Sequence, residues 1–339
     1  MLNTVELLTK ARQGQISAVA RLLSIVENDE AEAADIVRST HTSTGHAKVI
    51  GITGPPGAGK SSLVSLLVAA YRASYSRVAV VAVDPSSPFT GGAILGDRIR
   101  MRERFLDEGV FIRSMANRGN SGGLARATRR VVNVLDALGF DIILVETVGV
   151  GQEEVEVVRV VDTVCLVTIP GAGDDIQAIK SGIMEIADIL VVNKADRPDA
   201  ERAVKDFAQM LTLGTPRLEW KIPIVKTSTT KNTGIDELTS AIDRHRAWAA
   251  ESGDAKRRNL EAIQNEVEAL LRDRVLRQLA VQVGDGRLER VVACVANREL
   301  DPYGAVDLLL GKSLAKLMTV EDRSGFLNRT TSQRASTES

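Results

Sequence analysis

The chain has 339 residues, 44% of them apolar, and its 43 basic residues nearly balance its 44 acidic residues, for a net charge of −1. This length and apolar content suit one large α/β domain with attached segments. The near-zero charge excludes a partner found by bulk attraction, such as nucleic acid or a membrane surface. No apolar run approaches the roughly 18 residues that cross a bilayer, and from the polar–apolar mixture of the first residues we expect no secretory leader. We therefore expect a cytoplasmic protein, with Cys165 and Cys294 as buried, unpaired thiols.

The first segment of the chain has apolar residues at helical spacing. Between residues 3 and 38 they recur at steps of three and four with charges between them, a pattern that predicts two short helices. The polar stretch 41–46 has the composition of a loop. We therefore expect an N-terminal helical extension over residues 1–45.

Short β-branched runs then alternate with helical stretches, of which the clearest are residues 61–71, 124–138 and 200–213. Most strand candidates are continuously apolar, and they are residues 49–53, 78–83, 110–114, 142–146, 164–169, 189–193 and 224–227. Continuous apolar runs are typical of strands buried on both faces of a mostly parallel sheet. The alternation predicts a doubly wound α/β domain over residues 46–252.

The pattern changes again at Asp254. Apolar residues at helical spacing predict one long amphipathic helix from Asp254 to about Ala280 and a second from Pro302 to about Met318. Two such helices cannot bury their apolar stripes alone, so they must pack on the α/β domain or on another subunit. We expect residues 253–329 to form a helical arm that joins a homodimer, and the polar residues 330–339 to be a disordered tail.

A glycine-rich string separates the first buried strand from the helix after it, and it reads Gly54-Pro55-Pro56-Gly57-Ala58-Gly59-Lys60-Ser61. It fits Gly-x-x-x-x-Gly-Lys-Ser, the phosphate loop, in the strand-to-helix context that this motif requires. Glycine permits positive φ, so that successive N–H groups converge on the β-phosphate, and the helix N-terminus favours the same anion. Lys60 is predicted to reach the β- and γ-phosphates and Ser61 to bind Mg²⁺. Ser62 completes the predicted nucleotide contacts of this loop.

A second string, Asn193-Lys194-Ala195-Asp196, follows another buried strand. A carboxylate accepts hydrogen bonds from both N1–H and the 2-amino group of guanine, a donor pair that adenine does not present. We therefore expect Asp196 to select guanine, Lys194 to lie along the ring and Asn193 to tie this loop to the phosphate loop. Ser228, Thr229 and Thr230 follow the next strand, where GTPases commonly contact O6 of the base, although Thr229 stands where alanine is usual.

Three acidic residues are candidates for Mg²⁺ binding and hydrolysis. Asp84 and Glu146 end buried strands, at the edge where α/β folds bind ligands, and Asp97 lies in a glycine-bearing segment between them. Mg²⁺ takes oxygen ligands and keeps several waters, so one or two carboxylates suffice. For any single acid, a helix cap or a surface charge is the alternative. Gly149, three residues after Glu146, is predicted to touch the γ-phosphate through its N–H.

These residues closely resemble the MeaB/ArgK family of P-loop GTPases, whose human member is the methylmalonic aciduria type A protein. Besides the phosphate loop, the resemblance rests on Val83-Asp84-Pro85-Ser86-Ser87, Leu95-Gly96-Asp97-Arg98 and Glu146-Thr147-Val148-Gly149-Val150-Gly151-Gln152. The last string is the most specific, because most GTPases have Asp-x-x-Gly there. The resemblance covers almost the whole chain.

The resemblance implies a GTPase that uses GTP, GDP and Mg²⁺ and that serves an adenosylcobalamin-dependent acyl-CoA mutase as a chaperone. Such proteins gate cobalamin loading, protect or reactivate the mutase, and form homodimers through the C-terminal arm. By position, Asp84, Asp97 and Glu146 match the metal and hydrolysis carboxylates of the family, which act beside Lys60. The loops that bear Arg100, Asp174 and Lys180 match those that couple hydrolysis to the partner.

Three other functions remain open at this point. A metal-delivery GTPase of a related branch carries clusters of Cys or His, whereas this chain has three histidines and two separated cysteines. A kinase for small cationic amino acids needs a base beside an acceptor pocket, and no residue pattern indicates one. A signalling switch with an unrelated partner is compatible with the same nucleotide motifs.

Overall fold

The computed structural model describes residues 4–28, 32–84, 107–116, 123–147, 160–171, 186–213, 220–283 and 286–310. The chain divides into two compact units, Met1–Ala262 and Ile263–Ser339. The first unit contains the sheet with its flanking helices, and the described part of the second is helical. The predicted nucleotide motifs all belong to the first unit.

Seven parallel strands form one sheet in the order β3-β2-β4-β1-β5-β6-β7. They are β1 (Lys48–Thr53), β2 (Val78–Asp84), β3 (Val110–Ala116), β4 (Ile142–Thr147), β5 (Thr163–Thr168), β6 (Ile189–Val192) and β7 (Ile224–Lys226). The three strands β4, β5 and β6 are buried at every residue, as their continuous apolar runs predict. The prediction of a doubly wound α/β domain is confirmed.

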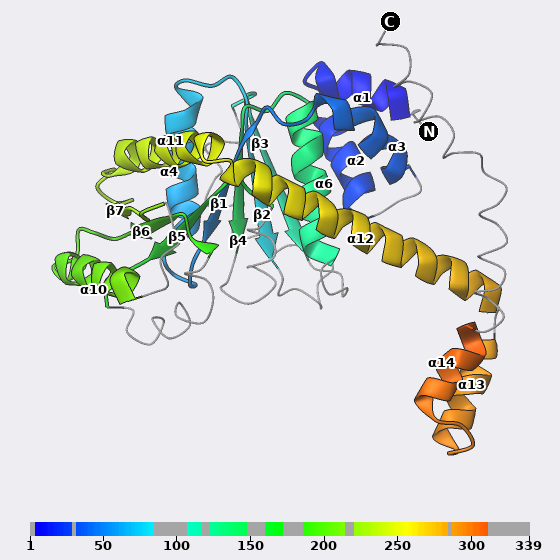
Figure 1. Ribbon diagram of the computed structural model, residues 1–339. Coiled ribbons are helices and arrows are strands. Elements are labelled where there is room, and N and C mark those ends of the chain that lie inside the picture. The colour runs from blue at the N-terminus through cyan, green and yellow to red at the C-terminus, as the bar shows by residue number, and fades with distance from the viewer. Residues whose placement is uncertain are drawn as a thin grey trace, which may run out of the picture. The chain divides into compact units, whose positions relative to one another are not determined.

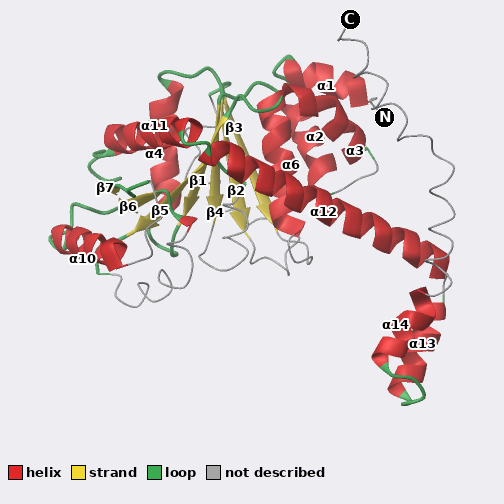
Figure 2. Cartoon of the chain, in the orientation of Figure 1, coloured by secondary structure: helices red, strands yellow, loops and turns green. Residues whose placement is uncertain are grey.

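Helices cover both faces of this sheet (Figures 1 and 2). On one face, α4 (Lys60–Arg72) and α11 (Ile235–Glu251) share a hydrophobic core with alternate residues of the strands. On the other face lie α6 (Gly123–Ala137) and α10 (Ala200–Leu213). All strand arrowheads point to one edge (Figure 1), so the loops after β1, β4, β5 and β6 leave the sheet together. The predicted phosphate and guanine motifs therefore share one edge.

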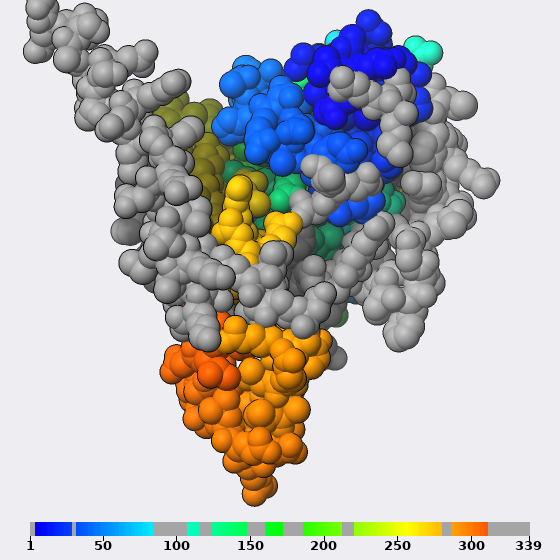
Figure 3. Space-filling model, turned by 90° about the vertical axis from the view of Figure 1, so that its right-hand side faces the viewer, coloured from blue at the N-terminus to red at the C-terminus, as the bar shows by residue number. Residues whose placement is uncertain are grey.

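The N-terminal segment contains three helices rather than the two that the sequence predicts. They are α1 (Thr4–Arg12), α2 (Ile16–Glu27) and α3 (Ala33–Thr40), followed by a 3₁₀ turn at His41–Ser43. Helix α3 has only eight residues, too few to be stable alone, and it is held because Ala33 and Ile36 are buried in the core shared with α6. Figures 1 and 3 show these helices beside α6, and Arg113 of β3 pairs with Glu27 of α2.

The C-terminal helices are α12 (Asp254–Val283), α13 (Arg287–Ala296) and α14 (Pro302–Leu310). The long helix from Asp254 is confirmed, α13 was not predicted, and the expected continuation of α14 to Met318 lies outside the described residues. Large apolar side chains on these helices are exposed, namely Leu260, Ile263, Val267, Leu270, Leu271, Leu276, Leu288, Val292, Tyr303, Val306 and Leu308. No described helix is long and apolar enough to cross a membrane.

The two cysteines differ in their surroundings. Cys165 of β5 is buried, as predicted, and burial raises the pKa of its thiol. Cys294 on α13 is only partly buried, contrary to the prediction, because α13 buries little more than Val291 among its own residues. Neither forms a disulfide.

A buried carboxylate lies at the amino ends of β5 and β6, the edge opposite the phosphate loop. Asp188, 1% exposed, accepts two hydrogen bonds from the Arg258 guanidinium on α12, from Nη1 to Oδ2 at 3.0 Å and from Nη2 to Oδ1 at 2.8 Å. The Val164 N–H donates to Oδ2 at 2.9 Å. Burial opposes ionisation, but the hydrogen bonds and charges of His245 and Arg258 outweigh it and lower the pKa of Asp188 to about 2.

Aromatic rings surround this carboxylate on its other side. His245 is fully buried, with Nε2 3.4 Å from Asp188 Oδ1 and Nδ1 2.9 Å from the Thr163 hydroxyl. Trp220 and Trp248 flank the imidazole at centroid distances of 5.0 Å and 5.8 Å. The bonds between Arg258 and Asp188 join the first turns of α12 to the sheet. The first compact unit accordingly includes the start of α12 and ends at Ala262.

Candidate nucleotide site

The phosphate loop has the backbone that its glycines predict. Gly54, Gly57 and Gly59 have φ values of 145°, 78° and 88°, and α4 begins at Lys60 directly after the left-handed Gly59. A Cβ at Gly54 would lie 2.0 Å from the Val167 carbonyl oxygen, and one at Gly59 would lie 2.4 Å from Asn193 Nδ2. Side chains are excluded at both positions, and the loop wraps over the N-terminus of α4, which is a favourable place for an anion.

Lys60 lies at the centre of this loop. Its side chain is buried, and Nζ donates to the carbonyl oxygens of Gly54 at 2.7 Å and Pro55 at 3.0 Å. An ammonium group has three donor hydrogens in rotatable positions. The loop therefore holds the cation on carbonyl oxygens at the point where the motif places phosphate oxygens.

Ser61 and Glu146, which the sequence predicts as partners at a Mg²⁺ site, are in direct contact. The Ser61 hydroxyl donates to Glu146 Oε1 at 2.6 Å, and Glu146 is buried at the carboxyl end of β4. A buried carboxylate beside a hydroxyl is a pair of hard oxygen donors. Asp84 is the last residue of β2, which pairs with β4. Its side chain lies outside the description, as do Asp97 and Gly149.

Two side chains of the second string contact the phosphate loop, and a third supports one of them. Asn193 Nδ2 donates to the Ala58 carbonyl at 2.7 Å, and Asn193 Oδ1 accepts from the Thr227 hydroxyl at 3.1 Å. Lys194, with a positive φ of 55°, donates from Nζ to the Gly57 carbonyl at 2.8 Å. The predicted link between the two loops is therefore present, and Thr227 supports it although the sequence did not single this residue out.

Asp196 is exposed and oriented by hydroxyl groups. Its Oδ1 accepts from the Ser228 hydroxyl at 2.5 Å and from the Thr230 hydroxyl at 3.4 Å. The hydrogen bond from Ser228 is the main reason that the pKa of Asp196 lies below its usual value. The carboxylate is thus ionised at neutral pH and faces solvent, as an acceptor for a ligand N–H pair must be.

A sequence model described as methylmalonyl-CoA mutase-associated GTPase MeaB matches residues 19–283. The chain belongs to the MeaB family of GTPases. Its relatives include a GTPase homologue of Pyrococcus horikoshii, 47% identical over 92% of this chain and 98% of its own. The methylmalonic aciduria type A homolog of Caenorhabditis elegans is 34% identical over 67% of this chain and 58% of its own.

A solved structure extends the likeness to three dimensions. The crystal structure of a LAO/AO transport system kinase superposes with a TM-score of 0.66 at 26% identity, and the match covers 93% of this chain and 99% of that one. The resemblance to the MeaB/ArgK family and the assignment of GTPase activity are thereby confirmed.

The fold of this MeaB-family GTPase brings most predicted nucleotide residues to one edge. Ser62 is exposed on the first turn of α4 and Thr229 is half-buried after β7, and their predicted contacts with the nucleotide stay predictions. Arg100, Asp174 and Lys180 lie outside the described residues. The Ser228 hydroxyl orients Asp196, and the predicted contact of this segment with O6 of guanine stays a prediction.

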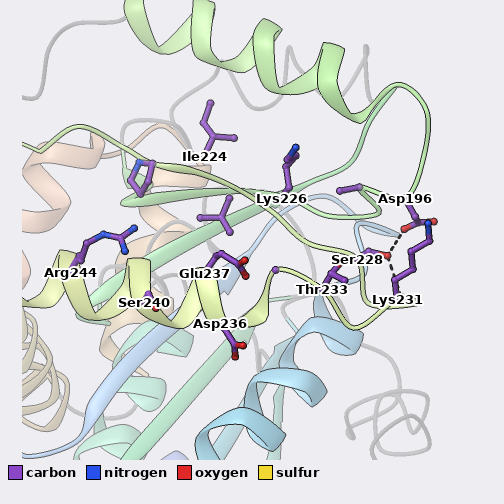
Figure 4. Close-up of a pocket in the computed structure, with 14 residues that line it drawn as sticks. Asp196, Ile224, Lys226, Ser228, Lys231, Thr233, Asp236, Glu237, Ser240 and Arg244 are labelled. Carbon is purple, nitrogen blue, oxygen red and sulfur yellow. Dashed lines mark hydrogen bonds between the residues drawn. The ribbon is translucent and has the colours of Figure 1, made fainter.

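A cavity of about 810 Å³ borders the guanine motif of this MeaB-family GTPase (Figure 4). It runs from Asp196 and Ser228 along β7 to Arg244 on α11. Figure 4 shows the Ser228–Asp196 hydrogen bond at one end of the cavity and Arg244 at the other. Both acidic and basic side chains line the cavity. No residue of the phosphate loop is among its lining residues.

Proposed function

We propose that this GTPase is a chaperone of an adenosylcobalamin-dependent acyl-CoA mutase, which gates cobalamin loading and protects or reactivates the mutase. The observation that carries the proposal is the match of residues 19–283 to a family described as associated with methylmalonyl-CoA mutase. The relationship to a methylmalonic aciduria type A homolog supports it. We place the protein in the cytoplasm.

In this proposal the phosphate loop binds the β- and γ-phosphates of GTP. Lys60 exchanges the carbonyl oxygens of Gly54 and Pro55 for phosphate oxygens, which carry more negative charge. Ser228 and Thr230 hold the Asp196 carboxylate toward solvent, where it accepts from N1–H and the 2-amino group of guanine. Asn193 and Lys194 keep the base and phosphate segments at a set distance.

The residues around Ser61 fit a Mg²⁺ ion. The Ser61 hydroxyl and the Glu146 carboxylate already converge at 2.6 Å, and Asp84 ends the neighbouring strand β2. Oxygen donors of this kind suit a hard divalent cation. We propose that Ser61, Asp84, Asp97 and Glu146 hold the ion directly or through water, and that Lys60, Asp97 and Glu146 serve hydrolysis. When bound, Mg²⁺ neutralises charge on the phosphates.

Arg100, Asp174 and Lys180 are the residues that we propose to couple hydrolysis to the mutase. A mutase shifts the nucleotide state only if it binds the GTP and GDP forms with different affinity, and the coupling is then reciprocal. Adding purified methylmalonyl-CoA mutase is expected to raise the GTPase rate, because a partner can complete the catalytic site of a GTPase. Arg100→Ala and Lys180→Ala should reduce this stimulation and leave GTP affinity unchanged.

The measurement is phosphate release with and without the mutase, together with mutase retention on the immobilised GTPase in GTP-analogue and GDP buffers. Equal rates with and without mutase, and no retention in either nucleotide, would reject the chaperone proposal. Stimulation of both variants to the wild-type level would instead reject the coupling residues and leave the partner assigned.

We further propose that the C-terminal arm joins two copies of the chain. Leu260, Ile263, Val267 and Leu271 recur along α12 at steps of three and four and are 40% to 62% exposed, as in a helix stripe that pairs with another helix. Val267→Glu combined with Leu271→Glu is expected to convert a dimer into a monomer, because the pair would bury two carboxylates.

Multi-angle light scattering at micromolar concentration measures this change. Arg272→Glu is the matched control, since it changes the charge of an exposed position on α12 outside the stripe and should leave the dimer intact. A wild-type chain that is monomeric across this range is the result that contradicts the dimer.

A further inference from the structure

Two buried threonines join β1 to β4 where the phosphate loop begins. Thr53 is the last residue of β1 and Thr147 the last of β4, with exposures of 1% and 0%. The Thr147 hydroxyl donates to the Thr53 hydroxyl at 2.9 Å. The parallel register runs from Lys48↔Ile142 to Ile52↔Glu146, so these threonines are the next pair. The bond between their side chains therefore joins β1 and β4 one residue beyond the last backbone pair, Ile52 and Glu146.

The bond lies on the opposite face of the sheet from the Ser61–Glu146 contact. Side chains alternate along a strand, and Glu146 reaches Ser61 on α4, whereas the neighbouring Val145 belongs to the core on the α6 face. Thr147 therefore points to that second face, where it meets Thr53. Thr53 precedes the phosphate loop and Ser61 follows Lys60. The loop is consequently tied at both of its ends to two consecutive residues of β4.

We propose that the Thr53–Thr147 hydroxyl pair positions Glu146 for GTP hydrolysis. On one face of the sheet, Ser61 holds the Glu146 side chain. On the other face, the bond from Thr147 to Thr53 holds the backbone next to Glu146. Without the threonine bond, the end of β4 keeps its backbone pairing with β2 but loses a side-chain tie to β1 directly before the phosphate loop. A displacement of about 1 Å at a catalytic group can lower a rate by about 100-fold. The inference rests on GTP hydrolysis by this chain and on the proposed role of Glu146, and it does not require the mutase.

The test is the set Thr53→Val, Thr147→Val and the double variant, measured without mutase. Valine has nearly the same shape as threonine and carries a methyl group in place of the hydroxyl. We expect each single variant to lower kcat by about tenfold while KM for GTP and GDP affinity change less than about twofold, the pattern of a lost transition-state contribution. The Mg²⁺ concentration for half-maximal rate should rise. The double variant should be no slower than either single one, because both remove the same bond.

Thr168→Val is the matched control. Thr168 also ends a strand at this edge, is fully buried, and points by alternation to the same face, but its hydroxyl has no hydrogen-bond partner among the described residues. Its removal should leave kcat at the wild-type value. Thr147→Ser, which restores the donor, should recover most of the rate lost in Thr147→Val.

Three results would overturn the positioning role. They are a kcat for Thr147→Val equal to that of Thr168→Val, additive losses in the double variant, or a loss of GDP affinity as large as the loss of kcat. The last would show a general collapse of the site. Each of these outcomes leaves the mutase proposal untouched, because stimulation by the mutase is measured separately.

Discussion

Asp196→Ala is expected to lower the preference for GTP over ATP by about 100-fold. The wild-type carboxylate accepts two charge-assisted hydrogen bonds from guanine, and adenine offers no such donor pair. A site built to bind ligand N–H groups discriminates strongly, because its polar groups are left unpaired by the wrong base. Calorimetric titration of the wild type and the variant with each nucleotide measures the effect.

The GTP preference of the wild type should not depend on pH near neutrality. The hydrogen bond from Ser228 lowers the pKa of Asp196 below its ordinary value of 3.8. The carboxylate is therefore fully ionised between about pH 5 and 8, and the preference for GTP should be constant over this range. Asp206→Ala removes an exposed carboxylate on α10 and serves as the control, with no change in preference. Equal affinity of the wild type for ATP and GTP would refute the guanine assignment.

Arg258→Ala is expected to lower the free energy of unfolding of the first unit by about 3 kcal/mol. The guanidinium is the charged partner of the Asp188 carboxylate, which is only 1% exposed, whereas Arg258 itself is 27% exposed. Removing one partner of a buried pair leaves an uncompensated charge, which typically costs about 3–5 kcal/mol, and the partial exposure of Arg258 favours the lower value. Arg257→Ala is the control, since the Arg257 side chain is 58% exposed and ion pairs of an exposed cation contribute less than about 1 kcal/mol.

Urea unfolding followed by tryptophan fluorescence measures the change in the free energy of unfolding, with a probe close to Asp188. The only two tryptophans of the chain, Trp220 and Trp248, flank His245 beside Asp188. The pKa of Asp188 is lowered to about 2 from 3.8, so its ionised form contributes stability above about pH 4 and loses it as the pH falls toward 2. The difference between wild type and Arg258→Ala should therefore be constant from pH 5 to 8 and shrink below pH 4. A difference that changes between pH 5 and 8 would point to another group.

Much of the site was predictable because its motifs are contiguous. The phosphate loop and the Asn193–Asp196 string each follow a buried strand, and parallel strands deliver their carboxyl ends to one edge. The contact between Ser61 and Glu146 follows from this rule, although the two residues are 85 positions apart. The prediction failed for α3 and missed α13, since helices of eight and ten residues depend on packing rather than on their own pattern.

The sequence by itself determined the strands, the two nucleotide motifs and the family. Each of these depends on residues that are neighbours in the chain, so their composition and spacing are enough to predict it. Only the tertiary structure decided which polar side chains meet across the sheet. Thr53 and Thr147 are 94 residues apart, and Asp188 and Arg258 are 70 apart. In the sequence each resembles an ordinary strand end or a surface charge. Their pairing arises from strand order and from the first turns of α12, because a hydrogen bond inside the fold depends on distance in space, not along the chain.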